Sequence, residues 1–400
     1  MIAMEKLSGR IRKISGSQTM AMNQKSRDLQ SQGKDIINLS VGEPDFHTPP
    51  HVKDAAKKAI DDNFSFYSPV GGYSDLKEAI SQKLLRENNL HYSTENIIVS
   101  NGAKHSIANA LMVLVDEGDE VIVPAPYWVS YVELAKLAGG TNVIIQSGIG
   151  SGFKVTPEQI EEAITPKTKV LLLCSPGNPT GSVYTKDELS DIAQVLTRYP
   201  NVFIISDEIY EHINYLGQHN SIADFDELRD RVVVVNGVSK AYAMTGWRIG
   251  YMAASTWIVK ACSKLQGHFT SGPSSIAQKA SVAALNGDNS YTEKMREAFL
   301  RRRNLVIERA GNIPGMVLSK PDGAFYIFPD ISSYVGLAHE GKVIKDDTDF
   351  CLFLLEQAHV AAVPGEAFGA PNHIRISYAT SDSKLDEAFD RIEKALKKLS

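Results

Sequence analysis

The chain has 400 residues, of which 43% are hydrophobic and 22% charged, and its formal net charge is −5. This length predicts two or more domains, and the composition is that of an ordinary globular protein. The acidic balance argues against a nucleic-acid partner, and no apolar run approaches the roughly 18 residues that a membrane-spanning helix requires.

The N-terminal segment predicts a short helix, a polar connection and a strand at residues 36–40, after which Gly42 marks a turn. Two helices, at 51–61 and 76–87, flank an aromatic loop that contains Tyr67. Taken alone, Gly42 is a turn residue and Tyr67 is a packing residue. Gly42 could also let a ligand approach the backbone closely, because it has no side chain.

Between residues 96 and 253, apolar segments alternate with amphipathic ones. Strands are predicted at 96–100, 120–124, 141–146, 169–174, 202–205, 232–235 and 249–253, and helices at 101–115, 129–138, 157–164 and 186–198. This alternation predicts an α/β architecture in which helices cover a parallel sheet.

The order of elements changes in the C-terminal part of the chain. Helices are predicted at 256–265, 274–285, 291–310, 348–357 and 384–399, and strands within 321–328 and at 360–363 and 373–378. This order predicts an α+β second domain, which the N-terminal segment joins. The run Arg301-Arg302-Arg303 is predicted to lie on a solvated helix face.

Three polar residues follow successive apolar strands. Asn178 lies in the loop after one strand, Asp207 at the end of the next, and Lys240 after the third. Parallel strands bring such ends together at the sheet edge where α/β proteins bind ligands. A lysine in an apolar pocket can bond to an aldehyde. The open alternatives are a surface lysine, an Asx turn at Asn178 and a strand-end cap at Asp207.

Two stretches supply groups that suit a phosphate. Gly102, Ala103 and Lys104 lie between a strand and a helix start, where free backbone N–H groups and the helix dipole favour an anion. Ser239 and Arg248 lie in the loop of the lysine, and arginine binds phosphate bidentately. Neither dinucleotide-binding nor P-loop glycine patterns are present. A lysine beside phosphate ligands indicates pyridoxal phosphate (PLP).

Residues 236–248 read Asn-Gly-Val-Ser-Lys-Ala-Tyr-Ala-Met-Thr-Gly-Trp-Arg and closely resemble the lysine segment of class I PLP aminotransferases. The resemblance covers essentially the whole chain and is strongest to the bacterial-type aspartate aminotransferases. It implies fold type I, with a large domain whose mostly parallel seven-stranded sheet is flanked by helices. A smaller α+β domain is built from both termini. The implied division is 1–47 and 296–400 for the small domain and 48–295 for the large PLP-binding domain.

The resemblance also implies a role for each candidate residue. Lys240 would form the Schiff base with PLP and move the proton during catalysis. The further cofactor ligands it implies are Gly102, Ala103, Lys104, Trp128, Asn178, Asp207, Tyr210, Ser239 and Arg248, with Tyr67 from the partner subunit. The substrate ligands it implies are Gly42, Lys104, Trp128, Asn178 and Arg375, and no metal is expected. Taken alone, Arg375 between two isoleucines could equally point outward from an edge strand.

These residues predict an aminotransferase that uses PLP and follows ping-pong kinetics. The amino group would pass between an amino acid, foremost aspartate or glutamate, and a 2-oxo acid, 2-oxoglutarate or oxaloacetate. The protein is expected to be a homodimer with shared active sites, without a nucleic-acid or membrane partner.

Three alternatives stay open. The first is a PLP lyase on the same scaffold, either a carbon–sulfur β-lyase or a cyclopropane-forming synthase. The second is an aromatic- or prephenate-accepting aminotransferase. The relatives that accept prephenate carry a basic residue where this chain has Ser15. The third is a PLP-sensing transcription regulator, which would need a DNA-binding module before the fold.

The three cysteines, Cys174, Cys262 and Cys351, are widely spaced and form no metal-ligand or disulfide pattern. This usage predicts a reducing compartment, and we expect the cytoplasm. The first 14 residues carry scattered charges and lack the apolar core of a signal peptide.

Overall fold

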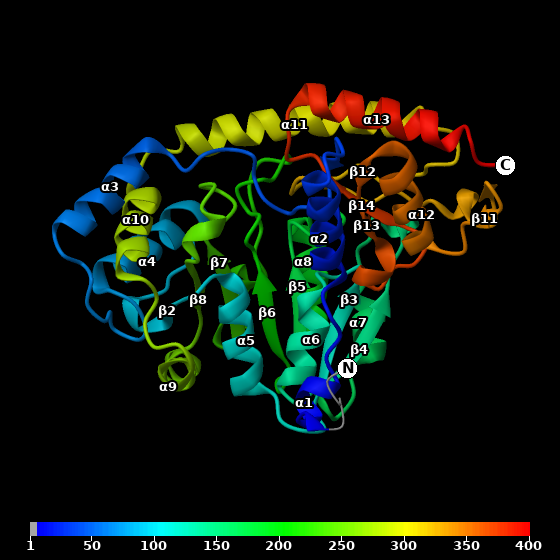
Figure 1. The fold of residues 1–400 in the computed structure, drawn as a ribbon. Helices are drawn as coiled ribbons and strands as arrows, with labels where there is room; N and C mark the ends of the chain where they lie inside the picture. Colours follow the sequence, from blue (N-terminus) through cyan, green and yellow to red (C-terminus); the bar gives the residue numbers. More distant parts are fainter. Residues whose placement is uncertain (1–5) are drawn as a thin grey trace.

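Seven strands form the central sheet, in the order β2–β8–β7–β6–β5–β3–β4. The computed structural model describes residues 6–400, and Figure 1 shows this sheet at the centre of the molecule. The strands are β2 (Ile97–Ser100), β3 (Glu120–Ala125), β4 (Thr141–Gln146), β5 (Thr168–Cys174), β6 (Phe203–Asp207), β7 (Val232–Gly237) and β8 (Gly250–Ala253). The neighbouring strands β4, β3, β5, β6 and β7 pair in parallel, and β8 pairs antiparallel with β2 and β7. The predicted mostly parallel seven-stranded sheet is confirmed.

Helices cover both faces of the sheet, because side chains on both sides of the strands are apolar and buried. One face packs against α5 (Ala103–Leu114), α6 (Ser130–Leu137) and α9 (Thr256–Phe269). The other packs against α3 (Pro50–Asp61), α4 (Ser74–Asn88), α7 (Pro157–Ala163), α8 (Lys186–Thr197) and α10 (Ser275–Asn286). Side chains alternate between these faces, so Ile205 of β6 packs with the first group and Ile204 with the second.

The N-terminal segment packs with the C-terminal part of the chain in a second core. β1 pairs in parallel with β12, and β14 lies between β13 and β9. Two long helices, α11 and α13, lie side by side along the top of the molecule in Figure 1. The elements are α1 (Gly9–Arg12), α2 (Gln18–Ser31), β1 (Ile37–Asn38), α11 (Ser290–Gly311), β9 (Tyr326–Ile327), β10 (Ala338–His339), β11 (Lys342–Val343), α12 (Asp347–Phe353), β12 (Val360–Ala361), β13 (Val363–Pro364), β14 (Ile374–Ser377) and α13 (Asp382–Leu396). The expected smaller α+β part built from both termini is confirmed.

The division of the chain into 1–47, 48–295 and 296–400 stays a prediction. α11 runs without a break through the boundary at 295/296. The first of these segments also begins with residues 1–5, which lie outside the described residues.

The predicted strand at 360–363 forms two short strands. Val360 and Ala361 pair with β1, whereas Val363 and Pro364 pair with β14. The segment therefore changes its strand partner within a few residues, and a continuous apolar run in the sequence does not predict such a change. The predicted helix at 348–357 is likewise divided, because α12 continues as a π-helical turn from Leu354 to Ala358.

The prediction of a solvated face for Arg301-Arg302-Arg303 is wrong for two of the three residues. The Arg301 side chain is 62% exposed, but Arg302 and Arg303 are only 7% and 6% exposed. Arg302 forms ion pairs with Asp45 at 2.7 Å and with Asp382 at 3.2 Å. Its partners are remote in sequence, and its aliphatic stem can be buried once the charged end is paired.

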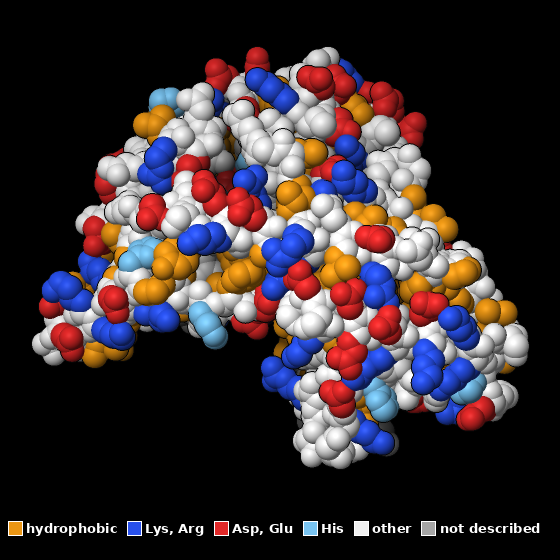
Figure 2. All heavy atoms as spheres, turned by 90° about the horizontal axis from the view of Figure 1, so that it is seen from above, with side chains coloured by type: hydrophobic (Ala, Val, Ile, Leu, Met, Phe, Trp, Pro, Cys, Tyr) orange, Lys and Arg blue, Asp and Glu red, His pale blue; other side chains and the backbone are white. Residues whose placement is uncertain are grey.

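The surface around α11 and α13 carries charges of both signs. Ion pairs join the two helices, among them Arg301–Asp382 and Arg309–Asp386. Figure 2, seen from above, shows Lys and Arg interspersed with Asp and Glu over this face. Among the helices of residues 6–400, none has the length and apolar character needed to cross a bilayer.

Candidate active site

A cavity of about 460 Å³ lies at the carboxyl ends of the parallel strands. Most of the candidate residues line it, namely Gly42, Ala103, Lys104, Trp128, Asn178, Asp207, Tyr210, Ser239, Lys240, Arg248 and Arg375. Gly102 lies directly before the lining residue Ala103, whereas Tyr67 lies elsewhere on the chain's surface. One fold therefore brings together residues that are spread over more than 300 positions of the sequence.

Lys240 follows β7 and reaches into the cavity from the loop after that strand. Its Nζ donates a hydrogen bond to the carbonyl oxygen of Gly42 at 2.7 Å, and lies 5.6 Å from the centre of the Tyr210 ring. Burial of the ammonium group lowers the pKa of Lys240 to about 8, although the Glu43 carboxylate opposes this shift. A lysine with this pKa is partly unprotonated near neutral pH and can act as a nucleophile or base.

Asp207 ends β6 and is 4% exposed. Its Oδ2 accepts a hydrogen bond from the Tyr131 hydroxyl at 2.6 Å, and its Oδ1 accepts one from the Ile209 N–H at 3.3 Å. Burial raises the pKa of Asp207 to about 6, and these two hydrogen bonds limit the rise. The carboxylate is therefore mostly ionised at pH 7 and is held in one orientation.

Arg375 lies in β14 and points inward, so the outward-facing alternative is wrong. It is 2% exposed, and it donates hydrogen bonds to Asn178 Oδ1 at 2.9 Å and to the Ser40 carbonyl oxygen at 2.7 Å. Its guanidinium lies 4.5 Å from the centre of the Tyr326 ring. The Arg375 Nε is buried without a hydrogen-bond partner among the described residues. Arg375 also lines the cavity, so its guanidinium is available to an anion there.

The start of α5 forms a second anion-binding element. Gly102 has φ +86°, and a Cβ placed there would come within 2.2 Å of Arg248 Nη2. Glycine is therefore required for the arginine to approach the helix terminus. Arg248 donates to the carbonyl oxygens of Thr245 at 2.8 Å and Asn101 at 3.3 Å, which fixes its guanidinium beside that terminus. Backbone N–H groups and a guanidinium together suit a phosphate.

Lys104 and Trp128 form one wall of the cavity. The Lys104 Nζ lies 4.8 Å from the centre of the Trp128 ring, a cation–π distance. Burial, together with the neighbouring Arg248, lowers the pKa of Lys104. Both effects disfavour the charged form of Lys104, so a negatively charged partner in the cavity, which Lys104 lines, would stabilise its ammonium group.

Close packing explains two further positions. A Cβ at Gly42 would come within 2.5 Å of the Tyr326 hydroxyl, so only glycine fits there. The Tyr326 hydroxyl in turn shares a 2.8 Å hydrogen bond with the Tyr210 hydroxyl. Tyr210 is thereby held with its ring beside Lys240.

The single chain does not bring Tyr67 to the cavity. Tyr67 is 96% exposed and borders a separate surface hollow of about 550 Å³ with Phe66 and Pro273. Its predicted role depends on a partner subunit and stays a prediction.

Sequence reasoning missed several residues that shape the site, above all Tyr131 and Tyr326. Tyr131 stands three positions after Trp128, at the start of the predicted helix, and this short spacing was an available signal because a single turn brings the centres of the two rings within 5.3 Å. Tyr326 gave none, because its contacts with Tyr210 and Gly42 join distant segments. The N-terminal residues Ser17, Thr19 and Met20 also line the cavity.

A buried lysine with a lowered pKa, a buried carboxylate and two groups of anion-binding donors thus lie together at the carboxyl edge of an α/β sheet, an arrangement typical of enzymes that act on small anionic molecules. The model of the family named aminotransferase class I and II matches residues 34–392. The chain belongs to this family of PLP-dependent enzymes, and it is an aminotransferase.

Three similar proteins illustrate the relationship. The aspartate aminotransferase of Bacillus subtilis is 45% identical over 397 residues, covering 99% of this chain and 100% of that protein. The aspartate/prephenate aminotransferase of Cereibacter sphaeroides is 46% identical, covering 97% of this chain and 98% of that protein. The solved aspartate aminotransferase from Thermus thermophilus with maleate has a TM-score of 0.92 and 40% identity, covering 97% of this chain and 99% of that one.

Proposed function

We propose that this aminotransferase binds PLP and transfers the amino group of aspartate or glutamate to 2-oxoglutarate or oxaloacetate. The observation that carries the proposal is the placement of Lys240, Asp207 and Arg375 around one cavity. These groups supply an amine nucleophile, a carboxylate and a cation for a substrate carboxylate. Relatives named aspartate aminotransferase support the choice of substrates.

The residues present fit PLP. The glycine cradle at Gly102, beside Arg248, suits its phosphate, and the unpaired Arg375 Nε suits a carboxylate of the substrate. When bound, PLP supplies an aldehyde that bonds to amines and a ring that withdraws electrons from the reacting carbon. We assign Asp207 to hold a proton on the ring nitrogen, Asn178 and Tyr210 to bind the ring oxygen, and Trp128 to cover the ring face.

Lys240 has two roles in this proposal. Its amine would hold the cofactor through the aldehyde, and as a free amine it would move the substrate's Cα proton as general acid and base. With a pKa of about 8, about one tenth of such amines are unprotonated at pH 7. We expect ping-pong kinetics, because the first substrate would leave its amino group on the enzyme and depart as an oxo acid before the second substrate binds.

We propose that Lys104 selects substrates with a second carboxylate, because its charge faces the cavity. A hydrogen bond to a charged group is worth roughly 1.5–3 kcal/mol, which corresponds to about a 10- to 150-fold change. Lys104→Ala should therefore lower kcat/KM for aspartate by about this factor, measured by steady-state kinetics. The matched control is an amino donor with an uncharged side chain, alanine or phenylalanine, for which kcat/KM should change much less. An equal loss for both kinds of donor would reject selectivity and leave Lys104 as a cofactor ligand.

We also propose a homodimer in which Tyr67 of each chain completes the other chain's site. The exposure of Phe66 and Tyr67, at 80% and 96%, supports a partner at this surface. Mixing Lys240→Ala chains with Tyr67→Phe chains should give hybrid dimers more active than either parent. One site of each hybrid then carries both defects and the other carries neither.

The hybrid experiment is measured as activity after subunit exchange, with exchange verified independently by differently tagged chains. A chain that is monomeric at micromolar concentration would contradict the shared site. Verified exchange without recovered activity would contradict it as well.

The similarity to a relative named aspartate/prephenate aminotransferase supports prephenate as a second candidate substrate. Ser15 does not supply a basic group; its backbone N–H donates to the Glu133 carboxylate at 3.0 Å. A panel of amino donors and oxo acids, including prephenate, separates these candidates, and product analysis without an oxo acid would reveal lyase activity. The cytoplasm remains our prediction for its location, from cysteine usage.

A further inference from the structure

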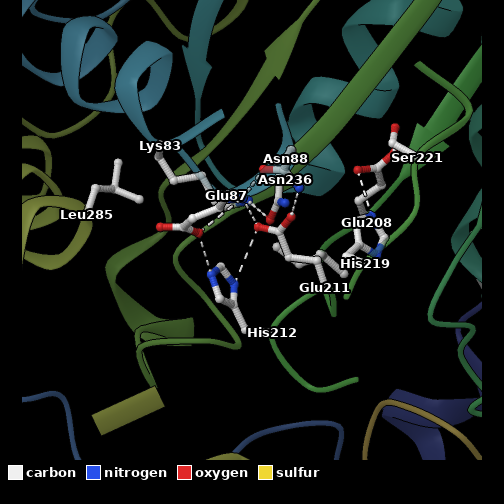
Figure 3. A network of polar contacts seen from close by, with 12 residues as sticks. Lys83, Glu87, Asn88, Glu208, Glu211, His212, His219, Ser221, Asn236 and Leu285 are labelled. Carbon is white, nitrogen blue, oxygen red and sulfur yellow. Dashed lines mark hydrogen bonds and ion pairs between the residues drawn. The ribbon is translucent and has the colours of Figure 1, made fainter. Parts of the chain in front are cut away.

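A second cluster of charged side chains lies behind the turn that carries Asp207 and Tyr210. Lys83 of α4 and Glu208 and Glu211 of the turn form its core. Figure 3 shows Lys83 and Glu211 pointing toward one another, and Glu208 directed toward Ser221 and His219. All three core residues are buried, with exposed fractions of 0%, 1% and 6%. Burying charge costs free energy, so a cluster of this kind needs a physical explanation.

The alternation of side chains along β6 places this cluster opposite the cavity. Ile205 and Asp207 face the side of α5 and α6, where Tyr131 meets Asp207. Ser206 and Glu208 face the other side, and the Ser206 hydroxyl donates to Glu208 Oε1 at 2.8 Å. Within one short segment, the catalytic candidates therefore point toward the cavity and the glutamates point to the opposite side of the sheet.

Contacts of Lys83 join α4 to the turn. The Lys83 Nζ donates to Asn88 Oδ1 at 2.8 Å and forms an ion pair with Glu211 Oε1. The other oxygen of Glu211, Oε2, accepts a hydrogen bond from Asn88 Nδ2 at 2.7 Å. Burial opposes the charge of Glu211, but Lys83, His212 and His219 together outweigh this effect and lower the pKa of its carboxyl. Both oxygens of Glu211 are thus fixed by residues of one helix.

The histidines and serines around the two glutamates complete the cluster. The His212 ring lies 2.9 Å from Glu87 Oε2 through Nε2 and 3.4 Å from Glu211 Oε1 through Nδ1. Glu208 Oε1 accepts a second hydrogen bond from the Ser221 hydroxyl at 2.6 Å. Its Oε2 lies 2.9 Å from Nε2 of His219, and both ends of the turn are therefore anchored.

The same side chains could hold a metal ion by distance alone, since Glu87, Glu211 and His212 offer ligand atoms within 4.8 Å of one another. Lys83 makes this interpretation unfavourable. Its ammonium already contacts Glu211 and lies 3.6 Å from Glu87, so it supplies the positive charge there. The cluster is organised around an internal cation.

We propose that Lys83 and Glu211 are positioning residues, whose ion pair ties the turn to α4 and fixes the directions in which Asp207 and Tyr210 enter the cavity. The catalytic consequence rests on the proposed function, while the anchoring itself does not. An apolar pair would cost less free energy to bury, but it would lack the directional contacts with Asn88 that hold Glu211 in one orientation. A shift of about 1 Å in a catalytic group can cost about 100-fold in rate.

The test uses Glu211→Gln, which keeps the shape of the side chain and removes its charge. Hydrogen exchange of residues 207–213 should accelerate by at least about tenfold in the cofactor-free protein. In the PLP-loaded enzyme, kcat per bound cofactor should fall by about 10- to 100-fold with KM changed much less. Glu78→Gln, which removes an exposed carboxylate of the same helix, is the matched control and should change neither quantity.

A rescue variant separates positioning from stability. In Asn88→Asp/Glu211→Gln the donor and acceptor change places across the same contact, and Lys83 again faces a carboxylate. We expect this variant to restore both the exchange rate and kcat, and it also carries the test if Glu211→Gln alone does not fold. Unchanged exchange at 207–213 and unchanged kcat per bound cofactor in Glu211→Gln, with only a lowered melting temperature, would overturn the proposal. Faster exchange without loss of kcat would overturn it too, because the ion pair would then hold the turn in place without contributing to catalysis.

The exchange experiment needs neither cofactor nor substrate. If the chain did not use PLP, a Lys240 substitution would reveal this, while the exchange result would still decide the anchoring.

Discussion

Lys240→Ala should lose nearly all transaminase turnover together with the visible absorbance that a lysine-bound cofactor gives. The amine at this position is proposed both to bond to the cofactor aldehyde and to move the substrate proton. Proton transfer alone is typically worth about 10²- to 10⁴-fold in rate, and the loss of the bonded amine adds to this. The purified wild-type protein should be yellow, and its band should shift when an amino donor is added.

The measurement combines an absorbance spectrum with single-turnover and steady-state rates. Lys169→Ala is a suitable control, since Lys169 lies on β5 outside the cavity, with its Nζ 5.6 Å from the centre of the Phe203 ring. This control should keep both the band and the rate. Transamination by Lys240→Ala at near the wild-type rate would refute the central assignment.

Arg375→Met should give the second largest effect, a fall in kcat/KM of about 30- to 5,000-fold for every amino acid and oxo acid. This range corresponds to the roughly 2–5 kcal/mol that truncating a buried, hydrogen-bonded charge partner costs in binding. Methionine keeps much of the side chain's volume, so the change removes the guanidinium without leaving a large cavity. Steady-state kinetics with charged and uncharged donors measure the effect.

Two comparisons give this result its meaning. Cofactor affinity should change much less than kcat/KM, because the substitution leaves the proposed phosphate ligands intact and touches the proposed cofactor ligands only through one hydrogen bond to Asn178. Arg303→Met also removes a buried arginine, but one outside the cavity, and should lower stability without changing kcat/KM. A loss confined to dicarboxylic donors would contradict the assignment of Arg375 to the α-carboxylate.

Sequence patterns were sufficient for the parts of the fold that depend on local periodicity. Most strands of the large sheet are apolar runs that end in a loop, and the apolar composition of both sides of these strands already indicated burial by helices. The same logic grouped Asn178, Asp207 and Lys240, because parallel strands share a carboxyl edge. All three line the cavity.

Only the tertiary structure decided the contacts between distant segments. The Tyr131 hydroxyl on Asp207 and the Tyr326 hydroxyl on Tyr210 join residues 76 and 116 positions apart. The inward direction of Arg375 depends on which side of β14 meets the cavity, and isoleucines on both sides of it conceal that choice.

Buried charged residues are the feature that the sequence patterns predicted least well. A run of three arginines predicts a solvated face, yet Arg302 is buried against Asp45 and Asp382. Lys83 similarly looks like a surface residue of an amphipathic helix until the turn after β6 brings Glu211 to it. Hydrophobic periodicity is encoded locally, whereas the partner that compensates a buried charge comes from elsewhere in the chain. The sequence alone therefore determines where the strands and helices form. Only their packing determines which charges can be buried.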